Sequence, residues 1–112
     1  MKFNVIKVTT ENELNKAIKY HKLEGTFFGI LYHSLWDKWS KDLVEKVELN
    51  HEDNEANPTL YLVDTFNLPH STVIYKDNQG NNISKVPALV VVKDKSVSVT
   101  DYLPDIYYGL GI

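Results

Sequence analysis

Hydrophobic positions follow two periods along the chain, one typical of strands and one typical of helices. Residues 3–8 alternate between apolar and polar side chains, which predicts a strand. Apolar positions at helical spacing over residues 11–23 predict a helix after it. Thr10 followed by Glu13 has the form of a capping box, and Gly25 is the expected stop signal. The chain therefore begins with a strand and an amphipathic helix.

A second strand and a second, longer helix follow. Residues 27–32 are almost all apolar, which is typical of a strand that is covered on both faces. The pattern over residues 34–49 predicts a helix with Ser34 as its N-cap and Asp37 in its first turn. One face of this helix is expected to carry its apolar residues: Trp36, Trp39, Leu43, Val44 and Val47.

The second half of the chain contains shorter elements. They are expected in this order: a polar loop over 50–58, a strand over 60–63, a turn over 77–82, strands over 88–92 and 96–100 joined by a turn over 93–95, and a helix over 104–110. Residues 66–76 are ambiguous, since Pro69 suits the start of a short helix while residues 72–75 suit a strand. The order predicts an α/β fold with a central mixed sheet of four to five strands flanked by helices.

Size and charge narrow the class of protein. A chain of 112 residues fits one domain, over 1–112. The net charge is −3, and the basic residues are twelve lysines and no arginine. Nucleic-acid binding is not expected, because the guanidinium fork that grips phosphate and guanine is missing and the lysines form no stripe. No run of residues reaches the length of a membrane span, so a soluble cytoplasmic protein without membrane contact is expected.

Three features together resemble the thioredoxin-like superfamily over nearly the whole chain. The strand that ends at Tyr32 runs through Trp36 into a long helix, and Trp36 matches the tryptophan that precedes the redox motif of that family. The segment from Val86-Pro87 into an apolar run resembles the family's hydrophobic-Pro-Thr segment, whose proline is cis. The hairpin and terminal helix that follow have the expected lengths. The resemblance implies a three-layer thioredoxin-like fold.

The departures from this family are as informative as the matches. In the implied alignment residues 37–40, Asp-Lys-Trp-Ser, stand where the family has Cys-x-x-Cys, and the chain contains no cysteine. Leu31 falls where thioredoxins place a buried aspartate that handles the proton. Thiol–disulfide chemistry needs a thiolate nucleophile. The chain is therefore expected to be a redox-inactive member, and not an enzyme.

The resemblance also implies a place for binding. In this fold the helix start and the residue before the cis proline form a groove that can pair with an extended peptide. The residues expected to bind a protein or peptide partner there are Trp36, Asp37, Trp39, Ser40, Val86 and Pro87. The competing interpretation is that Trp36 and Trp39 only cover the edge of the core, as aromatic residues at helical spacing usually do.

Two alternatives place other chemistry at the same helix start. Asp37, Ser40 and His33 could form a new catalytic set, although a Ser-His-Asp relay needs the histidine within hydrogen-bond reach of both partners. The simpler interpretation makes Asp37 a helix-start charge and Ser40 a surface residue. A glutathione-type ligand could use Ser40 with Lys38 and Lys41 as the local cations.

No metal or cofactor is expected. The histidines, His21, His33, His51 and His70, fall in four elements and lack the short spacings of a zinc site. The oxygen-rich loop over 51–55 lacks the glycine and the closing glutamate of a calcium loop.

The apolar C-terminal stretch over 102–112 supports a third hypothesis, a structural subunit. Most of it is expected to pack on the sheet as the last helix. Tyr108, Leu110 and Ile112 are the residues left over for self-association, and this hypothesis predicts a homo-oligomer through the C-terminal stretch.

Overall fold

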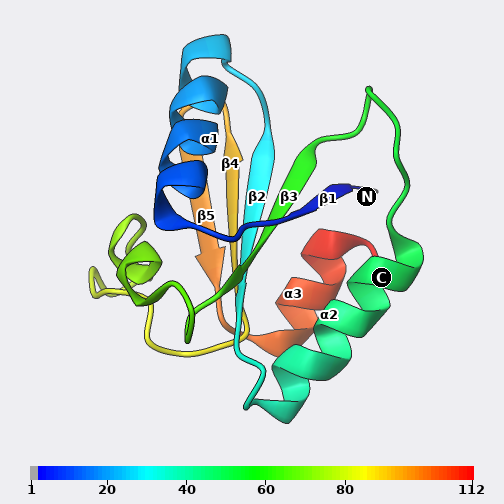
Figure 1. Cartoon of the computed structure of the whole chain (residues 1–112), viewed down its shortest axis with the longest axis vertical. Helices are drawn as coiled ribbons and strands as arrows, with labels where there is room; N and C mark the ends of the chain where they lie inside the picture. The colour runs from blue at the N-terminus through cyan, green and yellow to red at the C-terminus, as the bar shows by residue number, and fades with distance from the viewer. Residues whose placement is uncertain (1–2) are drawn as a thin grey trace.

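The computed structural model describes residues 3–112, and they form a five-stranded sheet with helices on both faces (Figure 1). The strands are β1 (Asn4–Lys7), β2 (Phe28–His33), β3 (Thr59–Asp64), β4 (Ala88–Lys93) and β5 (Ser96–Thr100). The helices are α1 (Glu11–Glu24), α2 (Lys38–Asn50), α3 (Leu103–Leu110) and the 3-10 helix η1 (Pro69–Val73). The predicted α/β class with a mixed sheet is confirmed.

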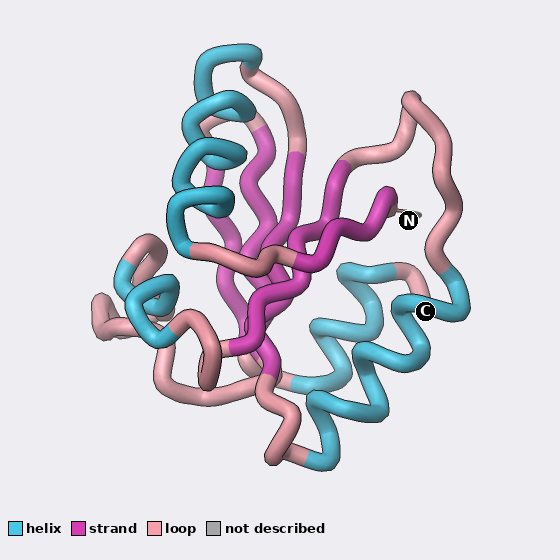
Figure 2. Tube along the Cα trace, in the orientation of Figure 1, coloured by secondary structure: helices cyan, strands magenta, loops and turns pink. Residues whose placement is uncertain are grey.

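The strands lie in the order β1-β3-β2-β4-β5, and the sheet is half parallel and half antiparallel. β3 pairs in parallel with β1 and with β2, while β4 pairs in antiparallel fashion with β2 and β5. The tube in Figure 2 shows α1 and η1 on one side of the sheet and α2 with α3 on the other. β2 and β3 are therefore covered on both faces, which explains their continuous apolar sequences.

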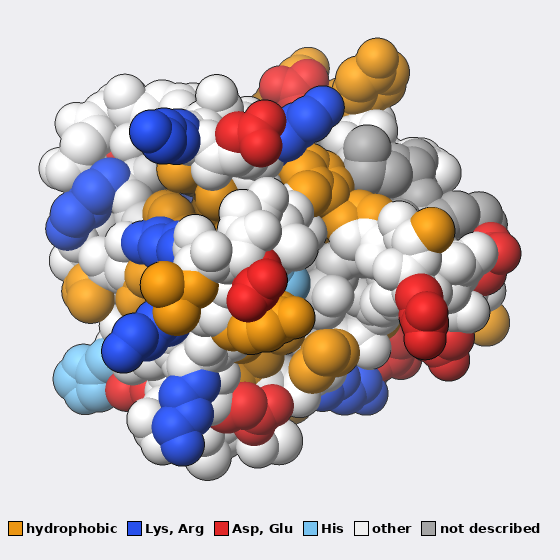
Figure 3. All heavy atoms as spheres, turned by 90° about the horizontal axis from the view of Figure 1, so that it is seen from above, with side chains coloured by type: hydrophobic (Ala, Val, Ile, Leu, Met, Phe, Trp, Pro, Cys, Tyr) orange, Lys and Arg blue, Asp and Glu red, His pale blue; other side chains and the backbone are white. Residues whose placement is uncertain are grey.

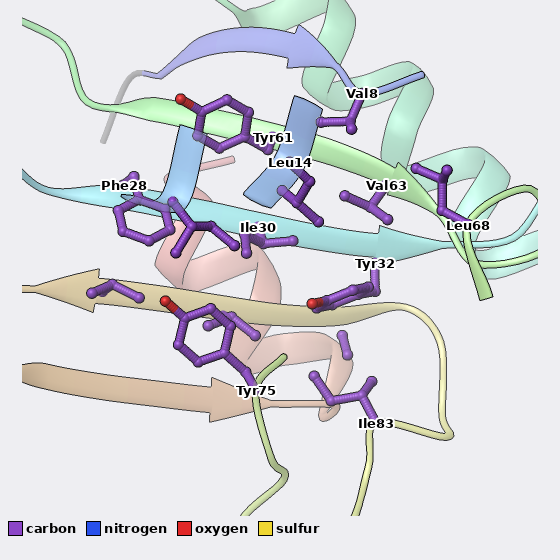
Figure 4. Packing of buried hydrophobic residues seen from close by; sticks show 14 residues of the cluster. Val8, Leu14, Phe28, Ile30, Tyr32, Tyr61, Val63, Leu68, Tyr75 and Ile83 are labelled. Atoms are coloured by element: carbon purple, nitrogen blue, oxygen red, sulfur yellow. The ribbon is translucent and has the colours of Figure 1, made fainter. Parts of the chain in front are cut away.

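Each face of the sheet has its own core. Alternate residues of β2 point to opposite faces, so Ile30 and Tyr32 pack beneath α1 while Leu31 packs beneath α2 and α3. Figure 4 shows the cluster on the α1 face, which Leu14 completes from the helix. Leu31 is fully buried in apolar surroundings on the other face.

Helix α1 has the ends that the sequence predicts, with one difference. The Glu13 N–H donates to Thr10 Oγ1 at 3.1 Å, and Gly25 ends the helix with φ 66°. The Glu13 carboxylate, however, accepts hydrogen bonds from the N–H and the hydroxyl of Thr9, not from the N–H of Thr10. The reciprocal half of the capping box is thus displaced by one residue.

The N-cap of helix α2 lies three residues later than predicted. Asp37, not Ser34, is its N-cap: Asp37 has extended backbone angles, and its Oδ2 accepts from the Ser40 N–H at 2.9 Å. Ser34 lies in the preceding turn, where its carbonyl accepts from the Asp37 N–H at 3.2 Å. Serine and aspartate are both favourable N-cap residues, so the sequence allows either Ser34 or Asp37. Because residues 34–37 form a turn, the helix begins only after Asp37.

The later start changes which residues of α2 face the sheet. The buried residues are Ser40, Leu43 and Val47, while Trp39 is 58% exposed. The predicted apolar face containing both tryptophans is wrong. Trp36 precedes the helix, and Trp39 is displaced by about 100° around the helix from Ser40.

The ambiguous segment over 66–76 forms the short helix η1 and no strand of the sheet. Pro69 is its first residue, as expected for a residue that needs no N–H partner. The loop after it closes through an isolated bridge between Lys76 and Asn82. This connection brings the chain to the start of β4.

Candidate functional site

The end of β2 and the start of β4 lie side by side at one end of the sheet. Tyr32 pairs with Ala88 in the antiparallel register, which places the following residues of β2 next to Pro87. The peptide bond between Val86 and Pro87 is cis. The two segments named from the sequence, one leading into α2 and one leading into β4, therefore reach the same end of the molecule.

The end of β3 lies on the other side of β2 at this point. His33 pairs with Asp64, and the His33 carbonyl accepts from the Thr65 N–H at 2.9 Å. The next residue, Phe66, is 67% exposed and contacts Trp36 edge to face, with ring centroids 6.2 Å apart. Sequence reasoning missed Phe66, and the available signal was an aromatic residue directly after a buried strand.

Four large apolar side chains are exposed around the start of α2. We call Leu35, Trp36, Trp39 and Phe66 the aromatic patch; their exposed fractions are 65%, 80%, 58% and 67%. None of them belongs to either hydrophobic core. The interpretation that the tryptophans cover the core edge does not fit this exposure. Large exposed apolar side chains gathered at one helix start are typical of an interaction surface.

The remaining predicted site residues are less exposed than the aromatic patch. Asp37 is half-buried and caps α2. Ser40 is fully buried, so its interpretation as a surface residue is wrong, and its Oγ has no hydrogen-bond partner among the described residues. Val86 is half-buried and Pro87 is buried.

The candidate catalytic set is not assembled. The Asp37 carboxylate is engaged by the Ser40 backbone N–H, and the Ser40 hydroxyl makes no hydrogen bond to His33 within residues 3–112. His33 is buried, and burial lowers the pKa of its imidazole, an effect that the nearby Asp64 carboxylate opposes. The Ser40 hydroxyl is therefore not activated by His33 and Asp37 in this geometry.

His21, the second buried histidine, is held by hydrogen bonds and ring stacking within the core. The ring of His21 is buried, lies 2.6 Å from Thr26 Oγ1 through Nδ1 and 2.5 Å from the Tyr61 hydroxyl through Nε2, and stacks on Phe28. Burial lowers the pKa of His21. Within the described part of the chain, no three His, Asp or Glu side chains are grouped so as to hold a metal ion.

The C-terminal residues divide between core and surface. Leu110 is 3% exposed and packs with Ile106 beneath the sheet, whereas Tyr108 is 89% exposed and Ile112 is 38% exposed. No helix in residues 3–112 is both long and apolar enough to cross a membrane.

No protein-family model matches the sequence, and no curated protein sequence matches it. Solved structures do match the fold. A thioredoxin from Nicotiana alata superposes with a TM-score of 0.71 at 10% identity, over 98% of this chain and 92% of the other. A thioredoxin from Schistosoma mansoni has a TM-score of 0.69 at 16% identity, over 96% and 94%. Thioredoxin O1 from Arabidopsis thaliana has a TM-score of 0.68 at 21% identity, over 95% and 96%.

The chain has the thioredoxin fold. The similarity extends over nearly the full length of each partner, so the thioredoxin-like architecture predicted from the sequence is confirmed. The chain differs from a redox-active thioredoxin fold in having no cysteine at the helix start or elsewhere. It therefore lacks the thiolate that disulfide reduction requires.

Proposed function

We propose that the protein binds a protein or peptide partner, without redox catalysis, through the aromatic patch and the neighbouring Val86-Pro87 segment. The observation that carries this proposal is the exposure of both tryptophans at the end of the sheet where β2 ends and β4 begins. Neither Trp36 nor Trp39 contributes to a core, so folding does not account for their position.

The residue types suit a binding surface. Tryptophan supplies a large contact area with few rotatable bonds and is enriched among residues that dominate binding energy. Asp37 caps the helix and thereby holds the chain on either side of it in place. Ser40 and Pro87 are buried, so the backbone at the start of α2 and before β4 is held in place, which lowers the entropy cost of association.

The binding geometry that we infer is an extended segment that lies along Val86 and places apolar side chains against the aromatic patch. Strand-like addition of this kind gains affinity from backbone hydrogen bonds and specificity from alternate side chains. The indole rings and Phe66 would then supply the apolar contacts.

The experiment compares the wild type with Trp36→Ala and Trp39→Ala in a quantitative pull-down, followed by direct binding measurements with each recovered protein. Tyr108→Ala is the control, because Tyr108 is also a highly exposed aromatic residue and lies on a different helix, α3. All three variants are expected to keep the wild-type circular dichroism, since the mutated side chains lie outside the cores.

Direct binding has a built-in reporter. The chain has two tryptophans and both lie in the aromatic patch, so a bound partner is expected to shift their emission to shorter wavelength. Loss of binding in both tryptophan variants with retention in Tyr108→Ala supports the proposal. Equal binding by all four proteins would exclude the aromatic patch as the contact surface.

A further inference from the structure

A groove on the α1 side of the sheet lies apart from the aromatic patch. It is formed by the second half of α1 and the residue that follows η1, and its volume is about 420 Å³. We call it the α1–η1 groove; it is lined by Asn15, Ile18, Lys19, Lys22, Leu23 and Ile74. The groove shares no residue with the aromatic patch, so it is a separate candidate surface.

The apolar part of the α1–η1 groove is open to solvent. Leu23 is 77% exposed, and its side chain belongs to neither hydrophobic core. Ile74 is half-buried, and its neighbour Val73 is 49% exposed. The outer side of a surface helix is ordinarily polar, so the packing of α1 does not account for a leucine in this position. An aliphatic side chain of a partner can reach Leu23 and Ile74 because both are accessible.

The charged residues of the α1–η1 groove are all positive. Lys19 and Lys22 are exposed, and no Asp or Glu is part of the lining. The one ion pair formed by residues 3–112 joins Lys7 to Glu48, so neither lysine of the groove is paired with a carboxylate. The Lys22 ammonium lies 5.9 Å from the centroid of the Tyr75 ring, at the outer limit of a cation–π interaction. Figure 3 shows most of the visible lysine side chains, with hydrophobic atoms between them, over the half that holds α1 in Figure 1.

An acidic segment of a protein fits these features better than an anionic membrane does. The whole chain has a net charge of −3, so an extended anionic surface repels the molecule as a whole. A short segment meets only the local charge, since charges more than about 10 Å away are largely screened at moderate salt. Exposed ion pairs add little affinity by themselves, but they orient a ligand whose apolar side chain is buried in the contact.

We propose that the α1–η1 groove binds a short acidic segment of a partner protein. One large aliphatic side chain of the segment packs against Leu23 and Ile74, and carboxylates on either side of it accept hydrogen bonds from Lys19 and Lys22. This surface does not depend on the function proposed for the aromatic patch. A single short segment is expected to bind weakly, with a Kd of about 1 mM at low salt, because it buries one side chain and forms exposed ion pairs.

The probe is the capped peptide Asp-Glu-Leu-Glu-Asp, titrated into the isotope-labelled protein at low salt and followed by amide NMR. Resonances of Lys19, Leu23 and Ile74 are expected to shift, and that of Trp36 is not. Two matched peptides separate the interactions: Asn-Gln-Leu-Gln-Asn keeps the leucine without the charges, and Asp-Glu-Ser-Glu-Asp keeps the charges without the leucine. Each is expected to bind at least about fivefold more weakly. Added salt should weaken binding of the acidic peptide only where its charges contribute.

Variants with matched controls test the assigned residues. Lys22→Gln is expected to weaken binding about threefold, and Leu23→Ala about fivefold. Lys41→Gln and Leu49→Ala are the controls, because they remove an exposed lysine and an exposed leucine from α2, and both should bind like the wild type. A double variant with Lys19→Glu and Lys22→Glu should reverse the preference and bind Lys-Lys-Leu-Lys-Lys more tightly than the acidic peptide.

Several results would overturn the proposal: no shifts on α1 at peptide concentrations well above the expected Kd, equal binding of the uncharged peptide, or unchanged affinity in Leu23→Ala. Absence of peptide shifts combined with retention by phosphatidylserine vesicles, lost in Leu23→Ala, would make the groove a lipid contact instead. Because Trp36→Ala should not alter binding of the acidic peptide, failure here and failure of the proposal for the aromatic patch are distinguishable.

Discussion

The N-cap of α2 allows a prediction that separates a structural role of Asp37 from a binding role. Asp37 Oδ2 accepts from the Ser40 N–H at 2.9 Å, and the first turn of α2 contains no acidic residue. Lys38 and Lys41 place positive charge near the same end, which the helix dipole disfavours. Asp37 is therefore the one negative charge at this helix start, and its removal is not compensated by a neighbour in the turn.

Two contributions set the expected magnitude for Asp37→Ala. Loss of the capping hydrogen bond costs about 1 kcal/mol, and loss of the charge–dipole interaction costs about 0.5 kcal/mol. The sum of about 1.5 kcal/mol corresponds to a fall in Tm of about 6 °C for a domain of this size. Asp37→Asn keeps an oxygen that can accept the bond, so it should lose only the second contribution, about 0.5 kcal/mol.

The assay is urea unfolding followed by circular dichroism, at low and at high salt. Glu45→Ala is the control, because Glu45 is an exposed acid in the interior of the same helix. Salt should shrink the difference between wild type and Asp37→Asn, since the charge interaction is screened, and should leave most of the Asp37→Ala effect. If Asp37→Ala is no more destabilising than Glu45→Ala, the capping argument is wrong.

Three further predictions concern stability. Gly25→Ala should lower the free energy of unfolding by about 1 kcal/mol in a urea titration, because the φ of 66° at the end of α1 strains any residue with a Cβ; an unchanged midpoint would contradict this. Ser40→Ala should leave the protein at least as stable as the wild type in the same titration. The substitution removes a buried Oγ without a partner, and alanine has the higher helix propensity. A fall of more than about 1 kcal/mol in the free energy of unfolding would mean that the hydroxyl makes a stabilising interaction. Burial lowers the pKa of His21 and of His33 in the folded state, so the unfolded chain binds protons more readily. The Tm should therefore fall as the pH decreases below about 6.5, the ordinary histidine pKa, toward the lower folded-state values. A Tm that stays constant or rises between about pH 7 and pH 5 would contradict this direction.

Local pattern was sufficient for most of the architecture. The apolar run that forms β2, the polar–apolar order around α1 and the turn before β5 each follow from interactions between residues close in the sequence, and the structure has the elements there. The absence of cysteine also excludes thiol chemistry without any structure. Together with the resemblance at Trp36 and Pro87, these observations predicted the thioredoxin-like fold that the solved structures confirm.

The candidate sites depended on tertiary structure. Trp39 was predicted on the buried face of α2, and Ser40 was described as a surface residue; the start of the helix at Lys38 reversed both, since one residue in a helix corresponds to about 100° of rotation. Phe66 joined the aromatic patch only because β3 pairs with β2, which brings residues distant in the sequence to one end of the sheet. Hydrophobic periodicity thus determined which elements form, whereas the exposure of individual side chains was decided by how those elements pack.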